Sequence, residues 1–185
     1  MIDETLLEAM EKMDNAVEHT QSHFASVRTG RATPSLVERL EIDYYGALVP
    51  LQQLAAISVP EARQLLIKPH DKGALAAVEK AIRDSDLGVS PNNDGIAVRI
   101  SLPQLTEERR REYVKVVKNM AEDGRIVVRA ARRDARKAME NAERDSDISA
   151  DELERAEKDL EKVTHEHVDH IDAALGRKES ELLEV

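Results

Sequence analysis

The chain has 185 residues, carries a net charge of −10 at pH 7 and contains no cysteine, which excludes disulfide bonds and any cysteine-based metal site or nucleophile. No apolar run approaches the ~20 residues needed to cross a bilayer, and the N-terminus lacks the features of a secretory signal, so we expect a cytoplasmic protein. Three tyrosines and one phenylalanine are the only aromatic residues, too few for a base-stacking platform.

Residues 3–28 are expected to form a helix, because apolar residues recur there in alternating steps of four and three. The expected inner stripe consists of Leu6, Met10, Met13, Val17, Thr20, Phe24 and Val27. The segment TGRATPS follows, and its glycine, proline and small polar residues are typical of a linker. The chain is therefore expected to leave this helical region near Gly30.

Between residues 31 and 104 the pattern becomes mixed. VERLEIDYYG alternates like a strand ending in a turn at Gly46, and LAAISV and RQLLIKP are short apolar runs suited to strands. GALAAVEKAIRDSDLG is typical of an amphipathic helix closed by Gly88, SPNNDG of a turn, and IAVRIS of a last strand before Pro103. These elements predict a small α+β domain, 31–104, inserted into the rest of the chain.

Residues 106–145 contain no proline and are expected to form one helix about 60 Å long, at ~1.5 Å per residue. Thr106 is its expected N-cap. Gly124 costs ~1 kcal/mol relative to alanine, and its place on the inner stripe favours a close helix approach over a hinge. The expected inner stripe consists of Tyr113, Val117, Met120, Gly124, Val127, Ala131, Ala135, Ala138 and Ala142.

A third helix is expected after the turn DSDIS, with Ser149 as its candidate cap. Its apolar stripe consists of Leu153, Ala156, Leu160, Val163, His167, Ile171, Ala174 and Leu182. Three such helices bury their stripes against one another, so we predict an α+β protein with a long three-helix bundle from 1–30 and 105–185. Two paired linkers would form a hinge between bundle and insert: Thr29, Gly30, Arg31 and Ala32, and Leu102, Pro103, Gln104 and Leu105.

RIVVRAARRDARK, residues 125–137, concentrates positive charge in an acidic protein. The segment contains six basic residues and one acid, so its net charge is +5 and that of the rest of the chain is −15. At ~100° per residue, four arginines share ~60° of arc, away from the small apolar residues: Arg125, Arg129, Arg132 and Arg136. A solvated face balanced by acids of neighbouring helices is one interpretation, and it stays open.

Two features favour nucleic-acid binding instead. The cations are mostly arginine, whose fork suits bidentate phosphate contact. Acids at i±4 are largely missing, so we expect free guanidiniums; guanidiniums that point inward or are consumed by carboxylates would contradict the hypothesis. Such a surface on an anionic body attracts nucleic acid at one place only, through phosphate and sugar. We use the name arginine ridge for the four arginines of this face, Arg125, Arg129, Arg132 and Arg136, together with the neighbouring Arg133.

The remaining motifs give little support for catalysis or metal binding. HEHVDH is not an HExxH motif, because its fifth residue is Asp169. His19 and His23 have i, i+4 spacing, but nothing nearby supplies further fixed ligands. A phosphate-binding loop and a nucleophile elbow are absent, and no carboxylates are marked out as a catalytic pair. We therefore expect no enzyme activity, metal or cofactor.

Five segments in order resemble the bacterial ribosome recycling factor family along essentially the whole chain: VRTGRATPSLVE, DYYG, VEKAIRDSDLGVSPNNDG, LPQLTEERRREYVK and VVRAARRDARK. The resemblance implies an L-shaped molecule with a three-helix bundle and a small hinged β/α/β domain, and no enzymatic activity. It implies that the protein binds the post-termination ribosome. With elongation factor G and its GTP hydrolysis, it would separate the subunits and free messenger and transfer RNA.

By the same resemblance, the bundle lies on large-subunit ribosomal RNA, and Arg129, Arg132 and Arg133 match the family's arginines there. Arg28, Arg31 and Arg110 match further basic positions of the family. For the group Arg109–Arg111 a purely structural role, in pairs with nearby glutamates, is the alternative to RNA binding. The residues predicted to bind ribosomal RNA are Arg28, Arg110, Arg125, Arg129, Arg132, Arg133 and Arg136.

The expected partners are the large ribosomal subunit and elongation factor G, with no membrane, and the chain is expected to be a monomer. Two residues depart from the family pattern: Ala130 replaces the usual asparagine, and Gly124 replaces an alanine-like residue. A helical adaptor that binds partner helices is the alternative, and it predicts exposed apolar stripes and self-association.

Overall fold

The structure is a computed structural model that describes residues 1–184. It divides into two compact units: Met1–Arg28 together with the chain from Glu107 onward, and Thr29–Thr106. The predicted insert, 31–104, lies within the second unit. The combination of a helical bundle and a small sheet domain confirms the predicted α+β class.

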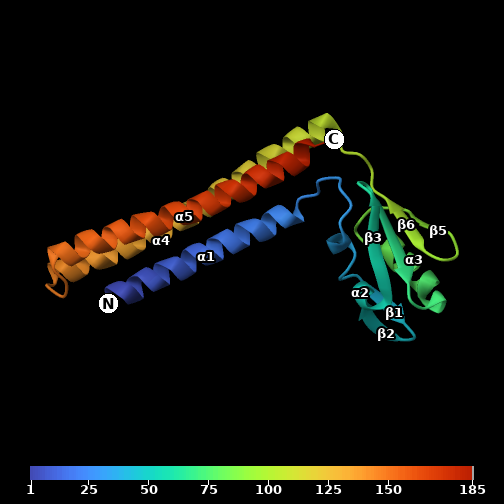
Figure 1. Ribbon diagram of the computed structural model, residues 1–185, viewed down its shortest axis with the longest axis horizontal. Coiled ribbons are helices and arrows are strands. Elements are labelled where there is room, and N and C mark those ends of the chain that lie inside the picture. The colour runs from blue at the N-terminus through green and yellow to red at the C-terminus, as the bar shows by residue number, and fades with distance from the viewer. Residues whose placement is uncertain (185) are drawn as a thin grey trace. The chain divides into compact units, whose positions relative to one another are not determined.

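The first unit is a bundle of three helices, α1 (Ile2–Ser26), α4 (Glu107–Arg144) and α5 (Ala150–Leu183). They lie side by side along their lengths, and α4 runs antiparallel to the other two (Figure 1). Their apolar stripes meet in one core, where Met13, Val117 and Ile171 are fully buried. The predicted three-helix bundle is confirmed, and the stripes that an adaptor would expose are covered.

Ser149 caps α5 as predicted. Its backbone N–H donates to Glu152 Oε2 at 2.8 Å, and the N–H of Glu152 donates to Ser149 Oγ at 3.3 Å. This reciprocal capping box satisfies two backbone donors at the start of the helix. The chain therefore turns sharply after α4 and begins α5 at a defined residue.

The predicted stripe of α4 is wrong in its rotation at two places. Val127 and Ala138 are exposed, while the next residue in each case, Val128 and Met139, is buried. On a helix of ~3.6 residues per turn, adjacent residues lie ~100° apart, so periodicity alone leaves two choices per turn. Similarly, Met10 of α1 is partly exposed, and its neighbour Ala9 is buried.

The second unit contains two antiparallel sheets. The smaller pairs β1 (Glu41–Tyr44) with β2 (Ala47–Pro50), and the larger has the order β3-β4-β6-β5. The predicted turn at Gly46 is confirmed: Tyr45 and Gly46 have φ of 51° and 85°, as a two-residue hairpin turn with both central residues at positive φ requires. The larger sheet consists of β3 (Ala55–Glu61), β4 (Gln64–Pro69), β6 (Val98–Ser101) and β5 (Pro91–Asn93).

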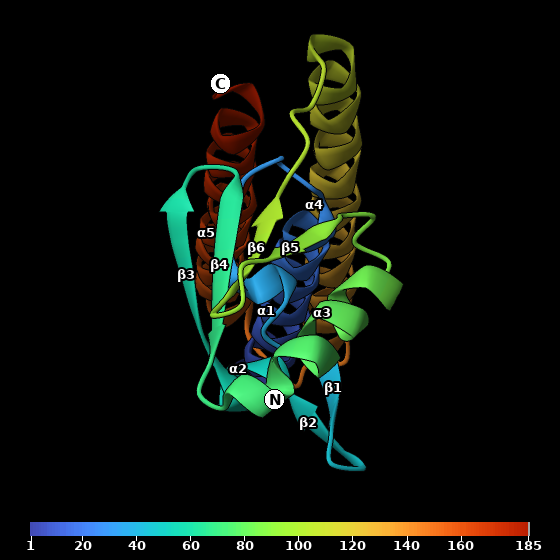
Figure 2. The ribbon, with the colours of Figure 1, turned by 90° about the vertical axis from the view of Figure 1, so that its right-hand side faces the viewer.

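Helix α3 (Leu75–Asp84) packs along the larger sheet (Figure 2). Buried residues of α3, such as Val78 and Ile82, meet those of β4 and β6, such as Ile67 and Ile100, in a separate core. Three short elements complete the unit: η1 (Pro34–Leu36), α2 (Leu51–Leu54) and η2 (Lys72–Ala74).

The segment SPNNDG is not only a turn, as the sequence predicted. Its residues Pro91–Asn93 form β5, which pairs with β6 at the edge of the sheet. Proline lacks the N–H that a central strand must donate, but an edge strand tolerates it. The actual turn follows, where Asp94 Oδ1 accepts the N–H groups of Ile96 and Ala97 at 3.0 and 2.8 Å.

Candidate nucleic-acid interface

Positive charge in the bundle is concentrated on α4. This helix has twelve basic and eight acidic residues, a net of +4. By contrast, α1 has one lysine against six acids, a net of −5, and α5 has five basic residues against eleven acids, a net of −6. The surface of α4 is therefore the part of the bundle suited to a polyanion.

Arg125 is the most enclosed member of the arginine ridge. Its guanidinium donates to Asp172 Oδ1 of α5 at 2.6 and 2.8 Å and to Glu122 Oε2 at 2.8 Å. The hydrogen bond from Arg125 is the main cause of a lowered pKa at Glu122. Because only 19% of its side chain is exposed, Arg125 mainly joins α4 to α5.

Three further ridge arginines are paired but reach solvent. Arg129 lies 3.1 Å from Glu122, Arg132 lies 3.0 Å from Glu161, and Arg136 lies 2.9 Å from Glu140 and 3.1 Å from Glu157. Their side chains are exposed to 46%, 35% and 56%, respectively.

The expectation of largely unpaired guanidiniums is thus wrong for four of the five ridge arginines. Part of the reason is tertiary: Asp172, Glu161 and Glu157 lie on α5, which runs beside α4, and no spacing within α4 reveals them. The remaining partners, Glu122 and Glu140, are on α4 itself. The interpretation left open from the sequence, a face balanced by acids of a neighbouring helix, describes these four residues in the free protein. The condition that contradicts an anchor of free guanidiniums is therefore met for them, and they could bind phosphate only by exchanging a carboxylate for it.

Arg133 is the exception within the ridge. It is exposed, and among residues 1–184 it has neither a hydrogen bond nor an ion pair. On α4 it lies one residue, or ~100°, beyond Arg132, on the side turned away from the buried stripe. Its guanidinium is therefore available to an external anion without loss of an internal partner.

The other predicted cations lie away from the ridge. Arg110 donates to the backbone carbonyl of Glu184 at 3.4 Å, and Arg28 follows the end of α1 and is exposed. Arg109 pairs with Glu112 at 3.2 Å, and Arg111 pairs with Glu107, one turn away on the same helix. The structural interpretation therefore describes Arg109 and Arg111.

The two predicted hinge segments, 29–32 and 102–105, touch within the second unit. Gly30 has φ of +78°, and a Cβ built on it would lie 3.3 Å from Cγ of Leu105. A side chain at residue 30 would be strained both by this backbone conformation and by the contact.

Both segments are also tied to the turn between β3 and β4. The N–H of Ala32 donates to the carbonyl of Ala62 at 2.8 Å, and the N–H of Leu102 donates to the carbonyl of Arg63 at 2.8 Å. Ala32 and Leu102 are thus held to the rest of the small domain by backbone hydrogen bonds.

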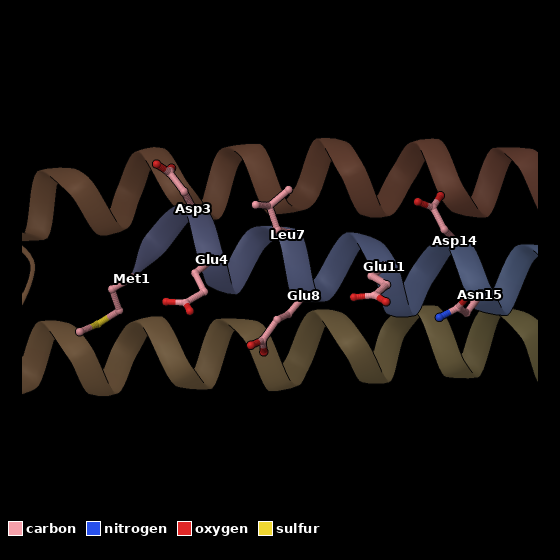
Figure 3. A pocket seen from close by; sticks show the side chains of 8 residues that line it. All are labelled: Met1, Asp3, Glu4, Leu7, Glu8, Glu11, Asp14 and Asn15. Atoms are coloured by element: carbon pink, nitrogen blue, oxygen red, sulfur yellow. The ribbon is translucent and has the colours of Figure 1, made fainter.

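The N-terminal half of α1 presents an acidic surface. Figure 3 shows the side chains that line a pocket here: they extend from α1 and from Met1 just before it, and most of them are carboxylates. Among the acids of α1, Asp14 alone has a side-chain partner within residues 1–184: its Oδ1 lies 2.8 Å from Nε2 of the buried His167. The lining residues are Met1, Asp3, Glu4, Leu7, Glu8, Glu11, Asp14 and Asn15.

The histidines do not form a metal centre in the described part of the chain. His167 lies on the α5 stripe as predicted, with Nδ1 2.7 Å from the carbonyl of Val163 and Nε2 on Asp14. His19 and His23 lie with their rings 4.1 Å apart. No group of three or more metal-ligating side chains occurs in residues 1–184. Nor is any helix there long and apolar enough to span a membrane.

Comparison with known proteins identifies the family. The sequence model of the ribosome recycling factor family matches residues 20–183. The chain is 56% identical to the ribosome-recycling factor of Beutenbergia cavernae and 54% identical to that of Thermobifida fusca, in each case over 100% of both chains. The chain belongs to the ribosome recycling factor family.

Solved structures of ribosome recycling factors support this assignment. A solution structure of the factor superimposes with a TM-score of 0.81 at 40% identity and covers 100% of this chain and 98% of that one. The Thermus thermophilus factor, described together with Escherichia coli elongation factor G bound to the E. coli post-termination complex, has a TM-score of 0.67 at 41% identity, with full coverage of both chains. Members of the ribosome recycling factor family are translation factors.

The acidic partners of the ridge were missed by reasoning from the sequence. Periodicity places the arginines on a face of α4 but does not give the register of α5 beside it. Antiparallel helices place residues of decreasing number opposite residues of increasing number, and the pairs of Arg125 with Asp172, Arg132 with Glu161 and Arg136 with Glu157 follow this order. Once the bundle is known, these acids can be located from numbering alone.

Proposed function

We propose that this protein recycles ribosomes after translation termination, by docking α4 on large-subunit ribosomal RNA. With elongation factor G, which hydrolyses the GTP, it promotes subunit splitting and the release of messenger and transfer RNA. The observation that carries the proposal is the full-length match to ribosome recycling factors, and a related factor described with elongation factor G on a post-termination complex supports it.

The arginine ridge is the proposed anchor, and its members differ in their roles. Arg133 is exposed and unpaired among the described residues, so it contacts phosphate at the least cost. Arg129, Arg132 and Arg136 are exposed enough to exchange a carboxylate for a phosphate. Arg125 acts mainly as a brace between helices. Arg28 and Arg110 extend the footprint.

The small domain is proposed to swing about the two linkers, residues 29–32 and 102–105. Elongation factor G pushes on this domain, and the anchored bundle passes the displacement to the contacts that hold the subunits together. The three-helix bundle suits this task because its core is continuous and its helices are cross-linked by ion pairs. The protein itself performs no chemistry, needs no cofactor, and works as a monomer in the cytoplasm.

A subunit-splitting assay tests the proposal. Post-termination ribosomes are mixed with elongation factor G and GTP, and the fall of light scattering is followed with and without the protein. We expect the fall only when the protein is present, and no fall would reject the proposed function.

Two arginine variants, measured for ribosome binding and for thermal stability, test the anchor. Arg133→Ala should weaken binding to ribosomes by ~1–3 kcal/mol without changing the melting temperature, because a charged contact is lost and no internal pair is broken. Arg125→Ala should mainly lower thermal stability, because it leaves Asp172 without its partner and removes one of the two arginines that pair with Glu122. Equal binding by wild type and Arg133→Ala would remove Arg133 from the anchor.

A further inference from the structure

We propose that Glu161 and Glu122 are positioning residues that compete with RNA for the ridge arginines and thereby limit how tightly the factor binds. In the free protein they hold the guanidiniums of Arg132 and Arg129, and on docking RNA phosphates replace them. This inference rests on the proposed function, since it assumes that α4 meets RNA.

Exposure separates the pairs that can be exchanged from those that cannot. Arg132 and Glu161 expose 35% and 58% of their side chains, and Arg129 and Glu122 expose 46% and 49%. Ion pairs between exposed side chains contribute little to stability, so they open readily. Arg125 is enclosed between two carboxylates, and we therefore exclude it from the exchange.

The geometry makes Glu161 a competitor of phosphate. Both of its carboxylate oxygens accept from the same nitrogen of Arg132, Nη1, at 3.0 and 3.3 Å. A phosphate needs the same donor, and an ionised carboxylate left close by would repel it. Losing the negative charge while keeping the side-chain shape should therefore strengthen RNA binding. In this view the two glutamates keep binding weak enough for the factor to leave after each round.

The test compares three substitutions in the full-length protein: Glu161→Gln, Arg132→Ala and the control Glu166→Gln. Glu166 lies on α5, is exposed, and has no hydrogen bond or ion pair among residues 1–184. Its substitution changes the net charge by the same amount without touching the ridge. Binding to isolated large ribosomal subunits is measured at several salt concentrations, and circular dichroism checks that each variant is folded.

We expect Glu161→Gln to bind large subunits ~3–10-fold more tightly than Glu166→Gln, with the gain shrinking at high salt. In the Arg132→Ala background the gain should disappear, because there is no guanidinium left to release. Binding by Glu161→Gln that equals or falls below that of Glu166→Gln overturns the inference, since the carboxylate then does not compete.

Failure of the inference can be told apart from failure of the proposed function. If Arg132→Ala and Arg133→Ala both bind as the wild type does, α4 is not the anchor and the docking proposal fails. If these variants bind weakly and Glu161→Gln shows no gain, only the competition by Glu161 is rejected. Should Glu161→Gln fold poorly, Glu122→Gln alone and with Arg129→Ala provides a second comparison with the same expected and contrary results. Because Glu122 also pairs with Arg125, thermal melts check that the brace between α4 and α5 is kept.

Discussion

Gly124 of α4 lies against both neighbouring helices of the bundle. A Cβ built at this position would overlap Oγ1 of Thr20 in α1 and would lie 3.2 Å from Cδ1 of Ile171 in α5. The resemblance to the family suggested that this glycine is a departure from an alanine-like residue. The structure supplies a local reason for it, because the Thr20 side chain occupies the space that a methyl group would need.

Gly124→Ala should lower the free energy of unfolding by ~1–3 kcal/mol, although alanine favours helix by ~1 kcal/mol. The overlap with Thr20 outweighs the propensity, because the Thr20 side chain must move to admit the methyl group, and its hydroxyl donates to the carbonyl of Ala16 at 2.7 Å. Urea unfolding followed by circular dichroism measures the change. Adding Thr20→Ala to Gly124→Ala should recover most of the loss.

Gly176 of α5 is the matched control, because nothing lies within 4 Å of a Cβ built there. Gly176→Ala should raise stability by ~1 kcal/mol through helix propensity alone. If Gly124→Ala is as stabilising as Gly176→Ala, then α1 and α4 can move apart at Gly124 without cost. Close packing of these two helices is then not the reason for the glycine.

The position of the ridge arginines could be predicted from the sequence better than their pairing. The concentration of arginines and their shared face follow from composition and helical period, and the structure places them on α4 as expected. Their state of pairing could be predicted only in part. Glu140 lies four residues from Arg136 on the same helix, whereas Glu161, the partner of Arg132, is close in space and distant in sequence. Which of the arginines meet RNA stays a prediction.

Among the helices and strands, the ends of the helices are easier to predict from sequence than the face that each helix buries. Capping and proline-free length are local properties, and the predicted 106–145 compares with Glu107–Arg144 in the structure. The rotation of a helix depends on which neighbours cover it. The sequence pattern therefore predicts that Val127 is buried, whereas in the structure Val127 is exposed and Val128 is buried. The short strand Pro91–Asn93 was missed because its pairing with β6, rather than any pattern in PNN, makes it a strand.

The cap of α5 predicts a dependence of bundle stability on pH. The backbone hydrogen bond from Ser149 is the main cause of a pKa of Glu152 below its ordinary 4.5. A lowered carboxyl pKa contributes stability that is present above the ordinary value and is lost as pH falls through the lowered one. In Glu152→Gln, the loss of thermal stability between pH 7 and pH 3 should therefore be smaller than in the wild type.

Ser149→Ala provides a second measurement at the same cap. It removes the side-chain acceptor for the Glu152 N–H and should cost ~1 kcal/mol at pH 7, as for other N-caps. Thermal melts of both variants at pH 7 and pH 3 separate the two contributions. An unchanged pH dependence in Glu152→Gln would show that the carboxylate is not held by the cap in solution.

For the whole molecule, the two units differ strongly in charge. The second unit has eight basic and nine acidic residues, so it is nearly neutral, whereas the bundle has nineteen basic and twenty-eight acidic residues. Nearly all of the net negative charge thus belongs to the unit that carries the proposed RNA anchor. A polyanion approaching the bundle meets attraction at α4 and repulsion at α1.

This arrangement predicts that the acidic surface of α1 prevents unproductive binding to RNA (Figure 3). Replacing Glu4, Glu8 and Glu11 by glutamine removes three negative charges from side chains that have no ion-pair partner among residues 1–184. Binding to an unrelated RNA at low salt should rise several-fold, since repulsion weakens and the arginine ridge is unchanged. Filter binding measures this, and the difference from the wild type should vanish at high salt because exposed charges are then screened. Because these three glutamates make no ion pair with the cations of α4 among residues 1–184, affinity for large subunits should rise much less than affinity for the unrelated RNA. An equal rise for both would mean that the acids only set the overall charge and do not direct the approach.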